Sequence, residues 1–301
     1  MPVSNRLPSQ FRKLRHIIGG LLLVLLTLGL SGCSAVKLSY NNAPELLYWW
    51  LDSYLDLNDT QSLQLRSDLT ALQAWHRQME LPLYLSTLEQ LQGLAVTPAS
   101  SPQVCTLYDQ VGPRLRALLD QVEPTLVALA PTLTATQLEH LAHQFDKRNQ
   151  KWRAEWLDSS APERNARRVK QLTDRAEHFY GRLEESQLAA LRTSVARSHF
   201  DPNLKYRETQ RRQQDMLQTL RQLQADPGPA ASVKAAIHAL LERAQNSPAG
   251  DYRNYAALLV QEYCGVVATL HNNATPAQRQ RLLETLQDYA ADARSLMAPS
   301  R

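Results

Sequence analysis

Residues 134–156 read TATQLEHLAHQFDKRNQKWRAEW, and this stretch decides the fold. Its large apolar residues are Leu138, Leu141, Phe145, Trp152 and Trp156. They follow one another at steps of three or four residues, or at sums of these steps, so that one face of an α-helix carries them all. The stretch therefore predicts a long amphipathic helix.

The same pattern recurs along the chain and predicts an all-α fold. Two further apolar faces consist of Leu63, Leu69, Leu72, Trp75 and Met79, and of Val260, Tyr263, Val267 and Leu270. Strong helix formers dominate the composition, and there are only 10 glycines. Breaks rich in proline, serine or aspartate fall at residues 97–102, 158–162, 201–202, 226–229 and 246–250. We expect a compact multi-helix bundle of roughly nine to eleven helices.

Four of the expected helices start with a shared signature, in which a glutamine follows a polar residue by three positions. The four segments are Asn58–Gln61, Thr134–Gln137, Glu184–Gln187 and Thr275–Gln278. This spacing is typical of a capping box, in which the two side chains bond each other's backbone N–H groups. It also resembles the L-T-x-x-Q motif of the Spy-like periplasmic chaperones, which implies a chaperone-like role. Plain helix capping is the favoured interpretation, because the spacing between the glutamines is uneven.

The start of the chain has the order of a signal peptide. Four basic residues precede an apolar run that ends at Leu30-Ser31-Gly32-Cys33. The run from Ile17 to Leu30 is shorter than the roughly 20 apolar residues that span a bilayer. Its end resembles the bacterial lipobox, and this resemblance implies that Cys33 is acylated and becomes the first residue of the mature protein.

The expected organisation is a signal peptide at 1–32, a lipidated tether at 33–40 and an all-helical periplasmic domain at 41–301. Ser34 follows the proposed anchor, and in enterobacterial lipoproteins a residue other than aspartate at this position favours the outer membrane. We therefore expect the protein on the periplasmic face of the outer membrane, held by its lipid. Removal of the leader leaves 29 basic against 29 acidic residues, which argues against a nucleic-acid partner.

Two cysteines remain once Cys33 carries lipid. Cys105 and Cys264 form an even pair in an oxidising compartment, which favours a disulfide between them. Each also stands in a helix-like stretch, where a free cysteine can serve as a small buried residue. A disulfide would tie an early helix to a late one and favours one domain over two.

The segment after the proposed tether carries a second resemblance. Residues 40–61, which read YNNAPELLYWWLDSYLDLNDTQ, are similar to the opening of a family of bacterial outer-membrane lipoproteins known only as a domain of unknown function. The arginine-rich stretch 163–177 and the segment that follows it fit the middle of that family. The resemblance implies an envelope location and helical character, and it supplies no catalytic residues.

Pro44 begins an unusually apolar helix within this segment. Its acidic positions, Glu45, Asp52 and Asp56, fall on one stripe, and tryptophan, tyrosine and leucine occupy the rest. A helix of this kind is usually buried, and we expect it in the core. The alternative is a helix that lies on the membrane surface beside the lipid anchor, although its acidic stripe would be repelled by an anionic surface.

A basic region follows between residues 147 and 182. The candidates for a binding surface are Arg148, Lys151, Arg164, Arg167, Arg168 and Lys170. Such a surface would suit acidic lipid headgroups or an acidic envelope protein. Acidic residues are interleaved at helical spacing, however, and favour a solvated, salt-bridged face.

Signatures of enzymes are missing from the sequence. There is no H-E-x-x-H, G-x-S-x-G or S-x-x-K set and no glycine-rich phosphate loop. The nearest approach to a metal site is the pair His140 and His143, which is more typical of a helix surface. We expect no catalytic residues, no metal and no cofactor, and a role in binding, scaffolding or chaperone-like activity. The alternative is a metal-dependent hydrolase that acts on envelope material.

Overall fold

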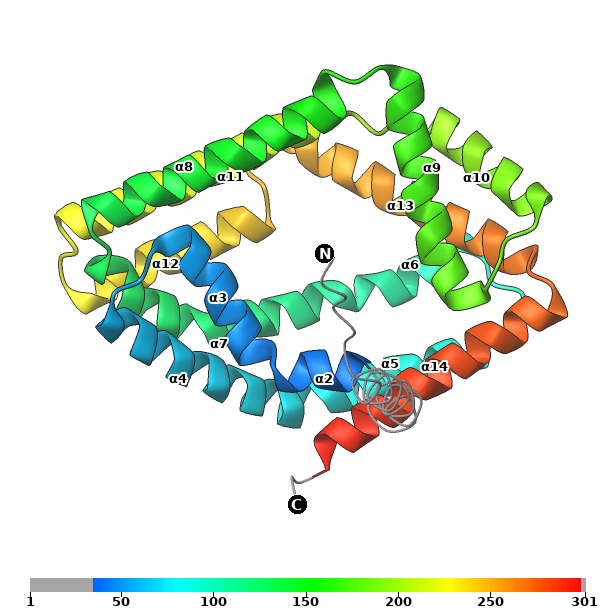
Figure 1. Cartoon of the computed structure of the whole chain (residues 1–301), viewed down its shortest axis with the longest axis horizontal. Coiled ribbons are helices and arrows are strands. Elements are labelled where there is room, and N and C mark those ends of the chain that lie inside the picture. Colours follow the sequence, from blue (N-terminus) through cyan, green and yellow to red (C-terminus); the bar gives the residue numbers. More distant parts are fainter. Residues whose placement is uncertain (1–34, 299–301) are drawn as a thin grey trace, which may run out of the picture. The chain divides into compact units, whose positions relative to one another are not determined.

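The computed structural model describes residues 35–298. Many of its helices begin at a capping residue or a proline, as the sequence predicts. The α-helices are α2 (Ala35–Asn41), α3 (Ala43–Leu55), α4 (Asp59–Trp75), α5 (Leu81–Ala95), α6 (Ser101–Asp109), α7 (Val111–Leu129), α8 (Ala135–Trp152), α9 (Ala161–Tyr180), α10 (Glu185–Arg197), α11 (Pro202–Ala225), α12 (Ala230–Gln245), α13 (Gly250–Asn272) and α14 (Pro276–Met297) (Figure 1). No strand occurs in the described residues, and the predicted all-α, multi-helix fold is confirmed.

Short stretches of other helix types join some of these elements. A π-helix, η2 (His76–Glu80), continues α4, and another, η4 (Arg153–Leu157), continues α8. A 3₁₀ turn, η3 (Ala130–Thr132), follows α7. Because π-helices contain i→i+5 hydrogen bonds, they shift the register of the side chains that follow them.

The chain divides into two units, Met1–Ala43 and Pro44–Arg301. The described part of the first unit is α2 with the residues that follow it, and α2 exposes Val36 and Leu38. The predicted signal peptide, the acylation site Cys33 and the sorting residue Ser34 lie outside the described residues. Among the helices that the structure describes, none combines the length and hydropathy needed to cross a bilayer.

Within the unit Pro44–Arg301, helices that are distant in the sequence pack side by side. α5 packs along α14, α6 along α13, and α8 along α11 (Figure 1). One core cluster joins α8, α11 and α12 through Leu138, Leu141, Leu220 and Ile237 with their neighbours. The apolar face predicted for residues 134–156 is therefore confirmed: Leu138 and Leu141 are buried, and Phe145 packs against their cluster.

The buried face of α4 differs from the predicted one. Leu69 is buried as expected, but Leu63 and Met79 are exposed, and Leu65 takes their place in the core. The reason is that Gln61 is itself buried, so the inward face runs through Gln61, Leu65 and Leu69. A pattern that counts only apolar side chains misses a face that begins with a buried amide.

The prediction that α3 is a core helix is wrong for most of its large side chains. Tyr48 is buried against Leu65 and Leu69, but Trp49 is 61% exposed and Trp50 is 52% exposed. The helix packs through one side only, so its other side remains at the surface.

Two pairs of buried glutamines join the starts of helices that are far apart in the sequence. In one pair, the side-chain nitrogen of Gln137 donates to the side-chain oxygen of Gln61 at 2.7 Å. In the other, Gln187 donates to Gln278 at 2.8 Å, and Gln278 donates back at 2.9 Å. The first pair links α4 to α8, and the second links α10 to α14.

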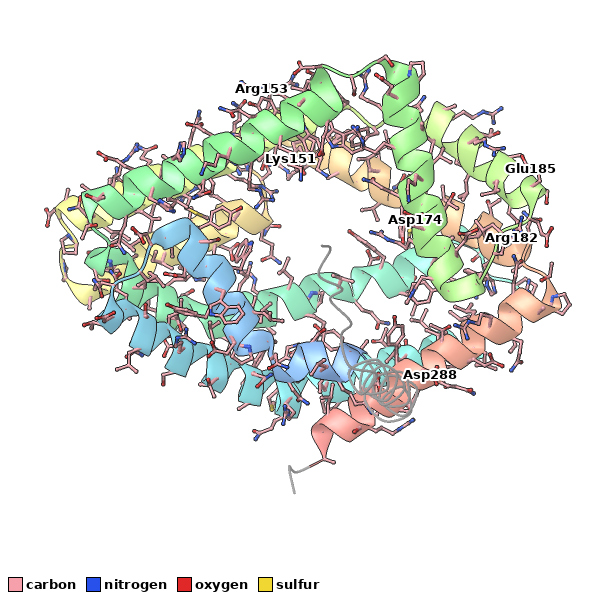
Figure 2. The ribbon with its side chains drawn as sticks, viewed as in Figure 1. Lys151, Arg153, Asp174, Arg182, Glu185 and Asp288 are labelled. Atoms are coloured by element: carbon pink, nitrogen blue, oxygen red, sulfur yellow. A yellow bond between two sulfur atoms is a disulfide. The ribbon has the colours of Figure 1, made fainter. Side chains whose placement is uncertain are left out.

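Each of these four amide groups has the same set of backbone partners. Its oxygen accepts the N–H of its own cap residue, as the capping-box pattern predicted. Its nitrogen donates to the carbonyl two residues before the partner's cap, which is Thr132, Asp56, Asn273 or Arg182, at 2.9 to 3.0 Å. Figure 2 labels Arg182 on the connection between α9 and α10. The four capping glutamines therefore make tertiary contacts between helices in addition to capping their own helices.

Candidate functional site: an apolar cavity

Helices from both ends of the unit Pro44–Arg301 surround a cavity of about 410 Å³. Its walls come mainly from α5, α6, α9, α13 and α14. The apolar lining consists of Leu91, Leu94, Ala95, Ala99, Val104, Leu107, Val111, Leu172, Ala176, Phe179, Leu191, Val266, Val267, Leu270, Leu282 and Leu286. This volume falls in the range of pockets that hold small molecules.

The cavity opens to solvent near the junction of α6 and α7. Tyr108 and Val111 line it there and are largely exposed, as is Arg175 of α9. The cavity is also lined by buried residues, among them Leu270, Leu286 and Ala95. The lining therefore extends from exposed residues at the surface to buried residues of the core.

Two polar residues of the wall are paired with each other. The hydroxyl of Tyr180 lies 3.0 Å from Nδ1 of His271, and Nε2 of His271 lies 2.8 Å from the carbonyl of Thr97. A neutral imidazole satisfies both contacts when Nε2 carries the proton and Nδ1 accepts from the tyrosine. Burial raises the pKa of Tyr180 to about 12, which keeps the hydroxyl protonated.

Arg175 is the one side chain of the lining with a permanent charge. Within residues 35–298 it makes no hydrogen bond and no ion pair. An exposed guanidinium at the edge of an apolar cavity presents its donors to whatever occupies the opening. The site thus combines an apolar interior with one available positive charge.

A disulfide and a pair of hydrogen bonds join α6 and α13 in one wall of the cavity. Cys105 and Cys264 form a disulfide with a Cα–Cα distance of 5.4 Å, in agreement with the predicted pairing. Their neighbours Val104 and Tyr263 line the cavity. At the start of α6, the side-chain amide of Asn272 bonds both the N–H and the carbonyl of Ala99 at 2.9 Å. These links hold the cavity wall in one arrangement.

The basic residues proposed as a binding surface are largely engaged within the protein. Arg148 donates to the hydroxyl of Tyr54 at 3.1 Å, and Arg164 and Arg167 donate to backbone carbonyls of Ser159 and Glu155. Lys170 forms an ion pair with Asp174 at 2.6 Å, and Lys151 lies 3.9 Å from Glu155. These contacts are what the salt-bridged alternative predicts, and the binding-surface hypothesis stays a prediction.

Arg168 is the most deeply placed member of that group. It donates to the hydroxyl of Ser198 at 2.8 Å and lies over the ring of Phe200 at 4.6 Å. Burial lowers the pKa of its guanidinium, although the charge of Glu262 opposes this shift. Arg168 therefore joins α9 to the end of α10 and to the residues that follow it.

The first histidine of the pair His140 and His143 contacts groups within the protein. Nε2 of His140 lies 3.1 Å from the carbonyl of Ser53 and 3.1 Å from the side-chain amide of Gln144. Among the described residues, no group of three or more histidine, cysteine, aspartate or glutamate side chains is arranged to hold a metal ion.

The fold and the cavity define an all-helical protein with an apolar site that is open to solvent. The chain belongs to the DUF6279 family, a family of unknown function, whose model matches residues 53–253. No curated protein and no solved structure matches the chain. Parts of the cavity lie outside the matched range, since all of α14, and all of α13 except its first four residues, follow residue 253.

Proposed function

We propose that this protein is a lipid-anchored lipoprotein on the periplasmic face of the outer membrane and that it binds an anionic amphiphile in the apolar cavity. The observation that carries the binding proposal is the cavity itself, whose interior is apolar and whose available charge is Arg175. An acyl chain would bury methylene groups against α5, α13 and α14, at roughly 0.8 kcal/mol for each group. A carboxylate or phosphate at its end would meet the guanidinium.

The membrane anchor rests on the lipobox resemblance at Cys33. Lipid attachment would hold the cavity close to a source of acyl chains, which raises their effective concentration. A binding role also suits a wall that is cross-linked rather than mobile, because a preformed site loses little free energy to ordering when the ligand enters.

Displacement of a fluorescent fatty acid from the unacylated chain of residues 34–301 tests the binding proposal. We expect palmitate and hexadecanol both to displace the probe, and Val267→Trp to abolish binding of both by filling the cavity. Arg175→Glu should weaken palmitate about tenfold, because an exposed ion pair worth up to about 1 kcal/mol is replaced by repulsion. Hexadecanol, which carries no charge, should bind this variant almost normally.

Two matched variants serve as controls for these measurements. Leu258→Trp adds the same ring on α13 outside the cavity lining, and Arg221→Glu makes the same charge change on α11. Both should bind the probe as the unmodified chain does. Equal binding by Val267→Trp, confirmed as folded by a cooperative melting curve, would contradict the proposed site.

The anchor has a separate test in intact cells. Replacement of Cys33 by alanine should abolish incorporation of labelled palmitate and block processing after Gly32, because only a thiol at this position accepts the diacylglyceryl group. The measurement is the labelled band and its mobility beside those of the unmodified protein. Continued incorporation of label by Cys33→Ala would show that the anchor is elsewhere.

A further inference from the structure

One side of α3 displays large apolar side chains to solvent. The exposed fractions are 49% for Leu46, 43% for Leu47, 61% for Trp49 and 52% for Trp50. Positions 46, 49, 50 and 53 are neighbours on a helix surface, and Ser53 between them is also exposed. We term Leu46, Leu47, Trp49, Trp50 and Ser53 the outer face of α3. Contiguous apolar surface of this kind marks an interaction site.

We propose that the outer face of α3 lies on the surface of a phospholipid bilayer. Tryptophan has an apolar body and one N–H donor, so it is well suited to the boundary between headgroups and acyl chains. The leucines on the same face supply purely apolar area that would enter the acyl region. A helix that lies flat in this plane buries its apolar side to a depth of about 5 to 10 Å.

The acidic residues of α3 do not oppose this arrangement. Glu45 forms an ion pair with Arg66, whose guanidinium also lies 3.6 Å from the centre of the Tyr48 ring. Asp52 accepts the backbone N–H of Leu57 at 2.9 Å. Both carboxylates are therefore engaged by partners within the protein. Two of the three carboxylates in the acidic stripe that argued against a membrane contact are thus paired within the protein, and the third, Asp56, lies beyond the end of α3.

The inner side of α3 is fixed to α4, which presents the outer face in one orientation. Tyr48 is buried against Leu65 and Leu69, and its hydroxyl donates to Ser62 at 3.0 Å. A face held in this way does not need to fold when it meets a surface. Its binding therefore costs less conformational entropy than the binding of a disordered segment.

The position of α3 in the chain favours a bilayer over a second copy of the protein. Pro44 follows Cys33 by so few residues that even an extended chain between them spans at most about 40 Å. This step rests on the proposed acyl anchor, whereas the apolar character of the face does not. An acylated Cys33 would keep α3 within this distance of the bilayer surface, where contact through the outer face adds to the attachment by the lipid.

Vesicle binding by the unacylated chain of residues 34–301 tests the proposal without the anchor. With vesicles of phosphatidylethanolamine and phosphatidylglycerol, we expect co-sedimentation that falls at least tenfold in the double variant Trp49→Ser/Trp50→Ser. Val96→Ser is the matched control, since Val96 is 60% exposed at the end of α5. Its binding should not change. Melting temperatures should be alike, because none of these side chains is buried.

Phospholipids brominated on their acyl chains give a second readout on the unmodified chain. They should quench the fluorescence of Trp49 and Trp50, and the residual emission of the double variant should be unquenched. Absence of both sedimentation and quenching would overturn the proposal. Light scattering gives a further outcome that would overturn the proposal. If the unmodified chain is a dimer, the double variant is a monomer and neither binds vesicles, the outer face contacts a second copy of the protein. Failure of the Cys33 anchor alone would leave this vesicle binding intact.

Discussion

At the scale of the residue, each buried glutamine makes more hydrogen bonds than helix capping alone requires, and these extra bonds explain why the side chain is an amide. The oxygen of each amide accepts from its own cap and from its partner, and the nitrogen donates to its partner and to a distant carbonyl. A glutamate would lack the donor, and a leucine would leave several buried backbone groups without partners. The sequence predicted the caps because a cap is local, but it did not predict the pairing.

Replacement of Gln187 by leucine should destabilise the protein by about 2 to 4 kcal/mol. The reason is that the cap N–H of Glu184, the carbonyl of Asn273 and the amide of Gln278 all lose a partner in a buried place. The measurement is chemical unfolding followed by circular dichroism.

Gln103→Leu is the control for this prediction, because Gln103 belongs to the exposed capping box of Ser100 and pairs with no other glutamine. It should cost less than about 1 kcal/mol. Equal losses in the two variants would mean that the buried pairing adds nothing to a simple cap.

At the scale of the element, helical character could be read from composition and periodicity, whereas the direction of each helix face could be read only in part. The face of α8 was predicted correctly because Leu138, Leu141 and Phe145 mark it at successive turns of the helix. The face of α4 was predicted wrongly because its first inward residue is Gln61. For α3, apolar residues occur on nearly every side, so the pattern contains no information about which side packs. That choice depends on the neighbours, which no single helix specifies.

At the scale of the whole molecule, the cavity could not be predicted from the sequence. Its lining comes from helices between α5 and α14, and each contributing residue has the appearance of ordinary core. On α13, Tyr263, Val267 and Leu270 belong to the face that the periodicity identified, and they line a cavity where close packing was expected. Only the cysteine pair carried a signal of long-range proximity. It joins residues 159 positions apart beside that cavity.

The double variant Cys105→Ala/Cys264→Ala should be less stable by about 3 to 5 kcal/mol, because a cross-link that closes so long a loop restricts the unfolded chain strongly. For a chain of this size, the melting temperature should fall by about 10 °C. Thiol labelling of the mature acylated protein in denaturant should find no free cysteine, and reduction should expose two. Two reactive thiols before reduction would show that the bridge does not form.

The placement of this bridge bears on how the protein would mature if it is exported as proposed. Cys105 would then cross the membrane first, and its thiol would remain unpaired until the 159 residues up to Cys264 had followed. The sequence contains only three cysteines, and acylation of Cys33 would remove one of them. The other two then have one possible intramolecular pairing. Oxidation therefore has no wrong product to correct within the chain. A thiol oxidase alone would complete it, without the slow reshuffling that proteins with several disulfides require.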